Sequence, residues 1–463
     1  MASRANQPEE VSARASITTD DPSTKAGLLQ PGHGLGMDAA KEYFGYQGVE
    51  IVSGSTLIVI TLIVITRRGG ANDRMRTLRP AIASLALVLA AGACSGAAAP
   101  AGVARDATPS QARVSDNQIH FAKSGWKTDF SKHSVPLSEI SSGGPPRDGI
   151  PPLDHPSFVS AAAADSWLRS KEPVISFSNE GEHRAYPLEI LIWHEIVNDT
   201  VGGMPVTVTY CPLCNSAIAF DRQLNGTVLD FGTTGNLRNS DLIMWDRQTE
   251  SWWQQFSGEA IVGQLNGAQL TLLPSSIVSW AEFKKSFPSG RVLSRDTGFD
   301  RSYGVNPYPG YDEVGSSPFL FNGKLDRRLP PKERVVTLEV GGQAVAYPYP
   351  VLVKQRVVND TVGGQQVVVL YQPGTNSALD GDSIPDSSDI GSTGVFSSIL
   401  SGRQLDFRWQ SGAFTDTQTG STWTLLGQAT AGGLQGQQLQ PLVHTDTFWF
   451  AWAAFRPHTQ IYR

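Results

Sequence analysis

The sequence predicts a strand-rich α+β protein built from two internally repeated lobes of about 130 residues each. Three observations support this fold class. The 463 residues include 46 glycines and 29 prolines, which favours many turns and short strands over long helices. Short segments of alternating apolar and polar residues lie between these turns. A long stretch of sequence also occurs twice, with its motifs in the same order.

The repeat is clearest where Ala185–Gly203 aligns with Ala346–Gly364 at a constant offset of 161 residues, with NDTVGG identical in both copies. It continues through residues 206–217 (VTVTYCPLCNSA) and 367–378 (VVVLYQPGTNSA). After a change in spacing, DRQTESWW in the first copy pairs with DTQTGSTW in the second. Ordered similarity over roughly a hundred residues indicates a duplicated unit.

The elements of the first lobe follow from local patterns. Hairpins are expected around residues 180–181, 202–203 and 225–226, where turn residues separate alternating segments. A short helix is expected to open at Pro187 and to reach about Trp193, because proline is favoured at the start of a helix. Residues 276–287 place Ile277, Trp280 and Phe283 on one side of an expected amphipathic helix.

The N-terminal region contains the parts of an export signal. Met75–Pro80 is a short cationic stretch, and Ala81–Ala93 is a 13-residue apolar run. A helix of that length rises only about 20 Å, too short to cross a bilayer, so this order is typical of a signal peptide. Ala91–Cys94 resembles a bacterial lipobox, which predicts lipidation of Cys94 and attachment to the cell membrane on its extracytoplasmic side. An ordinary signal peptide with an incidental cysteine is the alternative.

Residues 1–74 precede this signal and contain a second apolar stretch, Ile51–Thr66. Because a signal peptide normally begins a chain, we expect translation to start at Met75. The alternative is a membrane hairpin with Arg67–Arg79 as its cytoplasmic loop. The expected segments are an over-extended start or membrane segment (1–74), a lipoprotein signal peptide (75–94), a tether (95–145), the first lobe (146–297), a linker (298–319) and a degenerate second lobe (320–463).

From Cys94 onward the chain carries 28 basic and 35 acidic residues, a net charge of −7. This acidic balance gives no electrostatic reason to expect nucleic-acid binding. The expected partner is the membrane, through the lipid anchor, and the sequence identifies no protein partner.

Several stretches together resemble one protein family. They are GGPPRDGIPPLDHPSFV (143–159), HEIVNDTVGG (194–203), TYCPLCNSAIAFDR (209–222), GNLRNSDLIMWDRQTESWW (235–253) and YGVNPYPGY (303–311). They are similar to the Domain of Unknown Function 3179 family of exported bacterial and archaeal proteins. The resemblance runs from about Gly143 to the C-terminus and implies export and a site around the cysteines. It implies no reaction, so whether the protein is an enzyme stays open.

Cys211 and Cys214 form a Cys-Pro-Leu-Cys motif, and three interpretations of it stay open. A disulfide across this spacing closes a very short loop and would stabilise the fold by only about 2 kcal/mol. Such a disulfide would suit a non-catalytic binding module. Reversible thiol–disulfide chemistry suits the spacing, but the flanking residues look like strands rather than the start of a helix. Two thiolates on a turn between strands also suit a metal ion.

The metal interpretation needs further ligands. Only two cysteines follow Cys94, which excludes a closed four-cysteine site within one chain. His194 is the candidate third ligand, expected at the start of the strand that pairs with residues 204–211. Gln355, Gln372 and Thr375 stand in the second copy where the first has the histidine and the two cysteines, so the three groups are lost together. Two thiolates and an imidazole suit Cu(I) or Zn²⁺ with an open position, so metal binding or metal-dependent redox chemistry is the expected function.

Four further polar residues occur only in the pattern of the first lobe and are candidates for a pocket beside the cysteines. They are Arg222, Arg238, Asn239 and Asp241. Solvated loop residues would give the same pattern.

Overall fold

The computed structural model describes residues 119–463. The expected signal peptide, the Met75 start and the lipidation site Cys94 lie outside the described residues. Among residues 119–463 no helix is long and apolar enough to span a membrane.

The architecture is strand-rich with few, short helices, as the composition predicts. The helices are α2 (Ala161–Ala164), α3 (Leu188–His194), α4 (Trp280–Ser286), α5 (Tyr349–Gln355) and α6 (Trp449–Phe455), with 3-10 turns at Leu137–Glu139 and Ile384–Asp386.

The strands that precede residue 300 form three sheets and one small ribbon. The first sheet is β1 (Ile140–Ser142), β10 (Phe231–Arg238), β11 (Asp241–Asp246), β12 (Trp252–Gln254) and β13 (Glu259–Val262). The second is β14 (Thr271–Leu273), β7 (Ser216–Asp221), β6 (Met204–Cys211) and β5 (Ile196–Val201). The third is β15 (Ser276–Ser279), β3 (Pro173–Asn179), β4 (Glu182–Pro187), β16 (Arg291–Leu293) and β2 (Phe158–Ser160). The ribbon is β8 (Gln223–Leu224) with β9 (Thr227–Val228).

The later strands also form three sheets and one small ribbon, with fewer strands in each sheet. One sheet is β28 (His444–Phe448), β17 (Arg334–Val340), β18 (Gln343–Pro348) and β29 (Gln460–Ile461). Another is β19 (Val357–Val362), β20 (Gln365–Gln372) and β21 (Ser392–Ser397). A third is β24 (Phe407–Gln410), β25 (Ala413–Asp416), β26 (Thr422–Trp423) and β27 (Ala429–Ala431), and the ribbon is β22 (Ile399–Leu400) with β23 (Arg403–Gln404).

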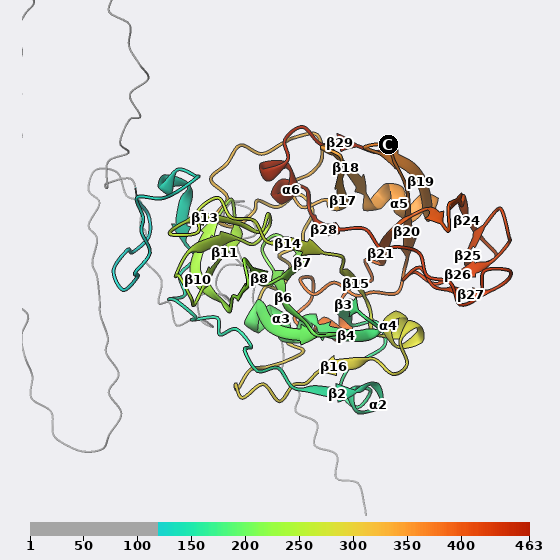
Figure 1. Cartoon of the computed structure of the whole chain (residues 1–463), viewed down its shortest axis with the longest axis horizontal. Helices are drawn as coiled ribbons and strands as arrows, with labels where there is room; N and C mark the ends of the chain where they lie inside the picture. Colours follow the sequence, from blue (N-terminus) through green and yellow to red (C-terminus); the bar gives the residue numbers. More distant parts are fainter. Residues whose placement is uncertain (1–118) are drawn as a thin grey trace, which may run out of the picture.

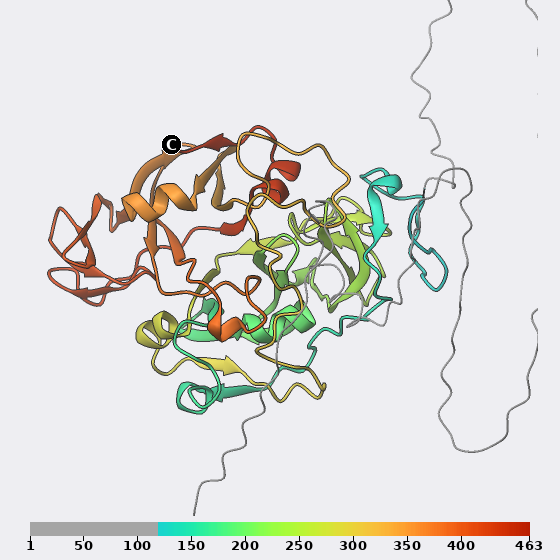
Figure 2. The same cartoon turned by 180° about the vertical axis from the view of Figure 1, so that it is seen from behind.

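The earlier elements, green to yellow, and the later ones, orange to red, occupy adjoining regions of the molecule (Figure 1). Seen from behind, an orange segment of the later half reaches in among the green elements (Figure 2), where the Asn376 amide donates to the Lys171 carbonyl oxygen at 2.8 Å. The two regions share one core, because β28 contacts both β7 and β15 at the centre. The largest hydrophobic cluster accordingly joins Ile175 and Phe220 to Phe448 and Trp449.

The hairpins predicted at residues 180–181 and 202–203 form. Glu180 (φ 47°) and Gly181 (φ 77°) connect β3 to β4, and a turn with positive φ at both central residues matches the twist of a two-residue hairpin. Gly202 has φ 55°, which favours glycine. A Cβ at this position would also meet the Asn179 carbonyl oxygen at 2.6 Å. β5 and β6 pair across this turn.

The third predicted hairpin is only partly correct. Asn225 and Gly226 do turn the chain, but between the two-residue strands β8 and β9. After β9 the Asn198 side chain binds both backbone groups of Phe231, donating to its oxygen at 2.8 Å and accepting from its nitrogen at 3.1 Å. Phe231 thereby starts β10 in the neighbouring sheet, while β7 pairs with β6 and β14.

The helix predicted over residues 276–287 is wrong in its first third. Ser276–Ser279 forms β15 and pairs with β3, so the side chains alternate there instead of following a helical period. Ser279 then caps α4, with its hydroxyl accepting a hydrogen bond from the Glu282 amide at 3.2 Å. The packing of Trp280 and Phe283 in the core follows the prediction.

The described part of the expected tether, residues 119–145, is packed against the first sheet. Ile140 pairs with Arg238 at the sheet edge, and Phe121 and Trp126 pack on Trp252 at ring distances of 5.1 and 5.0 Å. Its aromatic residues provide enough apolar surface to order the segment.

Residues 298–319, the expected linker, contain no helix or strand element and lie closely on the protein. Val305 forms an isolated bridge with Ser383, and the Asn306 amide donates to the Asp382 carbonyl oxygen at 2.8 Å. The same segment crosses the turn that carries the cysteines, where Tyr311 binds the Leu213 carbonyl oxygen at 3.1 Å.

Candidate metal centre

The two cysteines lie on a tight turn between two central strands. Cys211 ends β6 and pairs with Ser216 at the start of β7, so residues 212–215 form the loop. Asn215 has φ 52° and closes this loop, and its side-chain oxygen accepts a hydrogen bond from the Tyr210 hydroxyl at 3.1 Å. The turn folds both sulfurs inward, and Cys211 is 2% and Cys214 0% exposed.

A second hairpin, from a different sheet, brings a carboxylate to the sulfurs. Arg238 pairs with Asp241 across the two-residue turn Asn239-Ser240, whose φ values are 54° and 67°. Serine in this left-handed region costs roughly 1–2 kcal/mol, so the turn is held in place by its surroundings. It directs the Ser240 carbonyl oxygen to Cys214 Sγ at 3.6 Å and to Cys211 Sγ at 3.9 Å, where both thiols donate.

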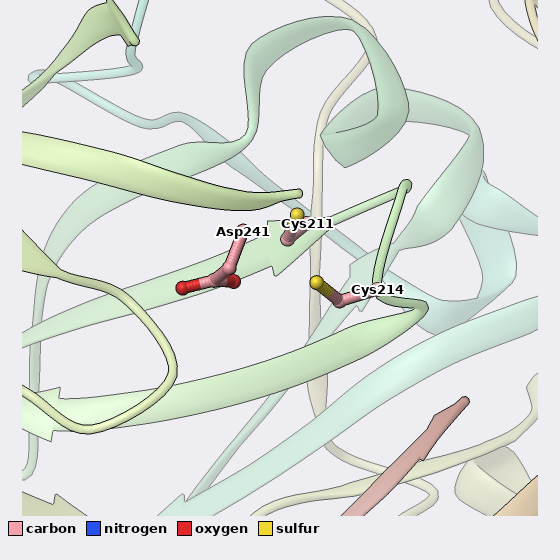
Figure 3. A group of neighbouring side chains, drawn as sticks. All are labelled: Cys211, Cys214 and Asp241. Atoms are coloured by element: carbon pink, nitrogen blue, oxygen red, sulfur yellow. The ribbon is translucent and has the colours of Figure 1, made fainter. Parts of the chain in front are cut away.

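Cys211, Cys214 and Asp241 point toward one another (Figure 3). Their two sulfurs and one carboxylate oxygen all lie within 4.8 Å of one another, and no other group of three metal-ligating side chains within residues 119–463 is this close. Asp241 Oδ2 accepts hydrogen bonds from Gln254 Nε2 at 2.6 Å and from the Phe256 amide at 2.9 Å. Asp241 Oδ1 is buried and has no hydrogen-bond partner in the described part of the chain.

Burial makes every acidic group of this cluster resist ionisation. It raises the pKa of both thiols, and it raises the pKa of Asp241 to about 7. Glu195, which precedes β5, has its pKa raised to about 8 by burial and then by the charge of Asp241. Among the described residues, the groups that shift these four pKa values most include no lysine and no arginine. A bound cation would supply the missing positive charge.

His194 lies outside this cluster, which corrects its expected position beside the cysteines. It is the last residue of α3 and does not start a strand, because α3 runs one residue beyond the expected end and Glu195 then turns the chain with φ 59°. Its Nδ1 contacts the Pro151 carbonyl oxygen at 2.7 Å, and its Nε2 contacts the Tyr303 hydroxyl at 2.7 Å. A carbonyl oxygen only accepts, so Nδ1 carries the proton and Nε2 accepts from Tyr303. Both ring nitrogens are occupied, so the structure brings Asp241, and not His194, to the sulfurs.

Of the four residues predicted for a pocket, only Asp241 reaches the cysteines. Arg222 binds Asp230 at 2.6 Å and the backbone carbonyl oxygens of Leu229 at 3.1 Å and Asp199 at 3.4 Å. Arg238 binds Glu139 at 2.8 Å and Gln254 at 3.4 Å, so it acts on the cluster only through Gln254. Asn239 forms the hairpin turn.

The sequence interpretation missed three residues that shape the cluster: Glu195, Ser240 and Gln254. Ser240 and Gln254 act through a backbone carbonyl group and a hydrogen bond to Asp241, for which no sequence motif exists. Glu195 was detectable only as an acidic residue next to the candidate histidine.

A family profile described as a protein of unknown function (DUF3179) matches residues 147–459. The chain belongs to the DUF3179 family. This confirms the family resemblance inferred from the motifs, and the match spans nearly all of the described chain. No curated protein and no solved structure matches the chain significantly. The DUF3179 description names no activity.

Proposed function

We propose that this protein binds one metal ion through Cys211, Cys214 and Asp241, and that it prefers Zn²⁺ to Cu(I). The observation that carries the proposal is the position of the two sulfurs and one carboxylate oxygen within 4.8 Å of one another in a buried cluster. The partnerless Asp241 Oδ1 supports it, because a buried carboxylate oxygen without a donor is costly unless a cation binds it. Two thiolates with a carboxylate suit Zn²⁺, whereas Cu(I) prefers soft ligands alone.

Thiol–disulfide exchange is the less well supported alternative. The attacking species in such chemistry is a thiolate, and burial raises the pKa of both Cys211 and Cys214. The nearby carboxyl groups of Asp241 and Glu195 raise the pKa of Cys211 further. A bound metal ion reverses this effect, because coordination favours the deprotonated thiol.

Elemental analysis of the full chain, purified reduced and without chelators, tests the proposal. We expect about one zinc ion per chain in the wild type and none in the Cys214→Ser variant. Thr375→Val, at the corresponding position of the second copy, is the control and should keep the metal. A wild type that takes up no zinc or copper while both thiols titrate as free would refute metal binding. Copper in place of zinc would overturn only the choice of ion.

We also infer that the two halves descend from one duplicated unit. Equivalent hydrogen bonds support this. Tyr186 donates to Asp199 at 2.7 Å and Tyr347 to Asp360 at 2.9 Å. Each half also has a tryptophan that donates to the aspartate of the DxxT turn, at 2.8 Å for Trp253 and 3.0 Å for Trp423.

The second copy fills the site position differently. Thr375, the counterpart of Cys214, shares a hydrogen bond of 2.7 Å with Ser392, and Gln372 donates to Glu282 at 2.8 Å. Hydroxyl and amide groups satisfy one another there, which supports a single metal centre per chain.

Export and a lipid anchor at Cys94 remain part of the proposed function. They are supported by the order of cationic, apolar and small residues between Met75 and Cys94. The metal centre would then face the extracytoplasmic side.

A further inference from the structure

The turn that carries the cysteines is held by residues far away in the sequence. The Cys214 carbonyl oxygen accepts hydrogen bonds from Thr447 Oγ1 at 2.8 Å and from the Phe448 amide at 3.0 Å, both in β28. The preceding carbonyl oxygen, of Leu213, accepts one from the Tyr311 hydroxyl at 3.1 Å. Two consecutive carbonyl groups of the turn are therefore fixed, one by Tyr311 and the other by β28.

Tyr311 also reaches the hairpin that carries Asp241. It lies in a segment that we call the strap, residues 303–321. Its hydroxyl accepts a hydrogen bond from the Phe319 amide at 3.3 Å while it donates to Leu213. The Phe319 carbonyl oxygen in turn accepts from Ser240 Oγ at 2.5 Å. The Ser240 carbonyl oxygen accepts hydrogen bonds from both thiols. Tyr311 therefore connects the cysteine turn to the hairpin that carries Asp241.

The position of Tyr311 is itself fixed by buried contacts. Lys332 Nζ donates to the Tyr311 carbonyl oxygen at 2.5 Å and lies 3.5 Å from the centre of its ring. Lys332 is 2% exposed, so this cation–π contact is shielded from solvent and correspondingly strong. The neighbouring Asp312 pairs with Arg334 of β17 at 2.7 Å. The strap is thereby anchored to the later half at the point where it meets the cysteine turn.

We propose that Tyr311 is a positioning residue of the metal centre: its hydroxyl fixes the cysteine turn against the Asp241 hairpin and keeps solvent from the two sulfurs. The first part of this inference rests on the proposed metal function, whereas the shielding of the thiols does not. Without the hydroxyl, the Leu213 carbonyl oxygen and the Phe319 amide both lose a partner. The turn and the strap then separate more easily, and the sulfurs become less well placed for an ion.

The test compares Tyr311→Phe with Tyr371→Phe in the full chain. Tyr371 is a suitable control, because its hydroxyl also donates to a backbone carbonyl oxygen, of Ile390 at 3.0 Å, in the other copy. Two readouts are needed: the Kd for Zn²⁺ by chelator competition with the Co²⁺ absorption spectrum, and the alkylation rate of the metal-free thiols. We expect Tyr311→Phe to weaken Zn²⁺ binding about 10–100-fold and to change the Co²⁺ bands. It should also speed alkylation of the thiols at least about tenfold, because a strap that opens more often exposes the two sulfurs more often.

The outcomes separate the two proposals. A Tyr311→Phe variant with the Zn²⁺ affinity, Co²⁺ spectrum and alkylation rate of the wild type would overturn the positioning role and leave metal binding intact. A wild type that binds neither ion, with alkylation accelerated only in Tyr311→Phe, would overturn metal binding and retain the shielding role. Equal changes in Tyr371→Phe would mean a general loss of stability and would refute the assignment. Thr447→Val, which keeps the Phe448 hydrogen bond, should give a smaller change in the same direction.

Discussion

Gln254 donates a hydrogen bond of 2.6 Å to Oδ2 of Asp241 and so fixes the orientation of this carboxylate beside the cysteines. The Phe256 amide binds the same oxygen, so Oδ1 is left for another partner. Arg238 donates in turn to Gln254 at 3.4 Å and to Glu139 at 2.8 Å. Glu139, Arg238 and Gln254 thus form a chain of hydrogen bonds from the edge of the sheet to the Asp241 carboxylate, which it orients.

Gln254→Leu should weaken metal binding by about 10–100-fold, the usual cost of removing a residue that orients a metal ligand. The Kd for Zn²⁺ by chelator competition checks this. Gln438→Leu is the control, since Gln438 donates to the Leu426 carbonyl oxygen at 2.9 Å, away from the cluster. An unchanged Kd in Gln254→Leu would mean that Asp241 is not a ligand or needs no orientation.

Asp241→Asn should stabilise the metal-free protein and abolish tight metal binding. The pKa of Asp241 is raised from 3.8 to about 7 by burial, so the folded state holds this proton more firmly than the unfolded state. Wild-type stability therefore falls as pH rises from about 4 to about 7, by up to about 4 kcal/mol from this group. Urea unfolding of the metal-free proteins at pH 5 and pH 8 should show the gain at pH 8. A variant that is less stable than the wild type at pH 8 would contradict the assignment.

His194→Gln should leave the metal content unchanged and alter the acid sensitivity of the fold. Burial lowers the pKa of His194 from 6.5 to about 4, so the unfolded state binds the proton more readily. Its contribution to stability is present above pH 6.5 and is lost as pH falls toward 4, by up to about 3 kcal/mol. Unfolding free energies measured between pH 4 and pH 7 should fall less steeply in His194→Gln than in the wild type. Loss of zinc in this variant would restore the ligand role predicted from the sequence.

Cys211→Ser and Cys214→Ser should both remove the metal and keep the fold. Serine is close to cysteine in size and can occupy the same buried positions of the turn, so the hairpin between β6 and β7 should still form. The second copy offers no equivalent turn, because Gln372 pairs with Ser392 and a long loop, residues 373–391, lies between them. Thr375→Val should keep the metal but cost about 1 kcal/mol, because Thr375 is buried and loses its hydrogen bond to Ser392. Thermal melts and elemental analysis check both statements. A serine variant that unfolds at room temperature would show that the pair is structural.

Cys94→Ser should release the protein from the membrane or leave an unprocessed precursor, because the thiol that carries the lipid is gone. Cell fractionation and the N-terminal sequence of the product check this. A wild-type product that still begins at Met1 would refute the expected start at Met75.

The parts of the fold that the sequence predicts well depend on local signals. The hairpins at residues 180–181 and 202–203 have turn residues that tolerate positive φ between alternating strands, and both form. Ser276–Ser279 has the same kind of alternation, but a helical pattern begins directly after it at Trp280. The strand has only four residues, too few for its alternation to be separated from the helical period that follows, so the sequence pattern predicts one helix over both.

The site shows why a ligand set is harder to predict. The Cys-Pro-Leu-Cys motif is local, and it does lie at the centre of the cluster. Asp241 comes from a strand of a different sheet, and its approach depends on the positive φ values of Asn239 and Ser240. His194 is near the cysteines in the strand pairing, but the left-handed turn at Glu195 separates it from them.

The hydrogen bond from Thr447 to Cys214 spans 233 residues. A growing polypeptide emerges from the ribosome with its N-terminus first, so the cysteine turn is made long before the residue that holds it. The proposed metal centre would therefore be complete only after β28 has been synthesised, and an ion bound earlier would meet two loosely held thiols. A product that lacks its last twenty or so residues would retain both cysteines and still lack the finished centre, because β28 and α6 begin at His444 and Trp449.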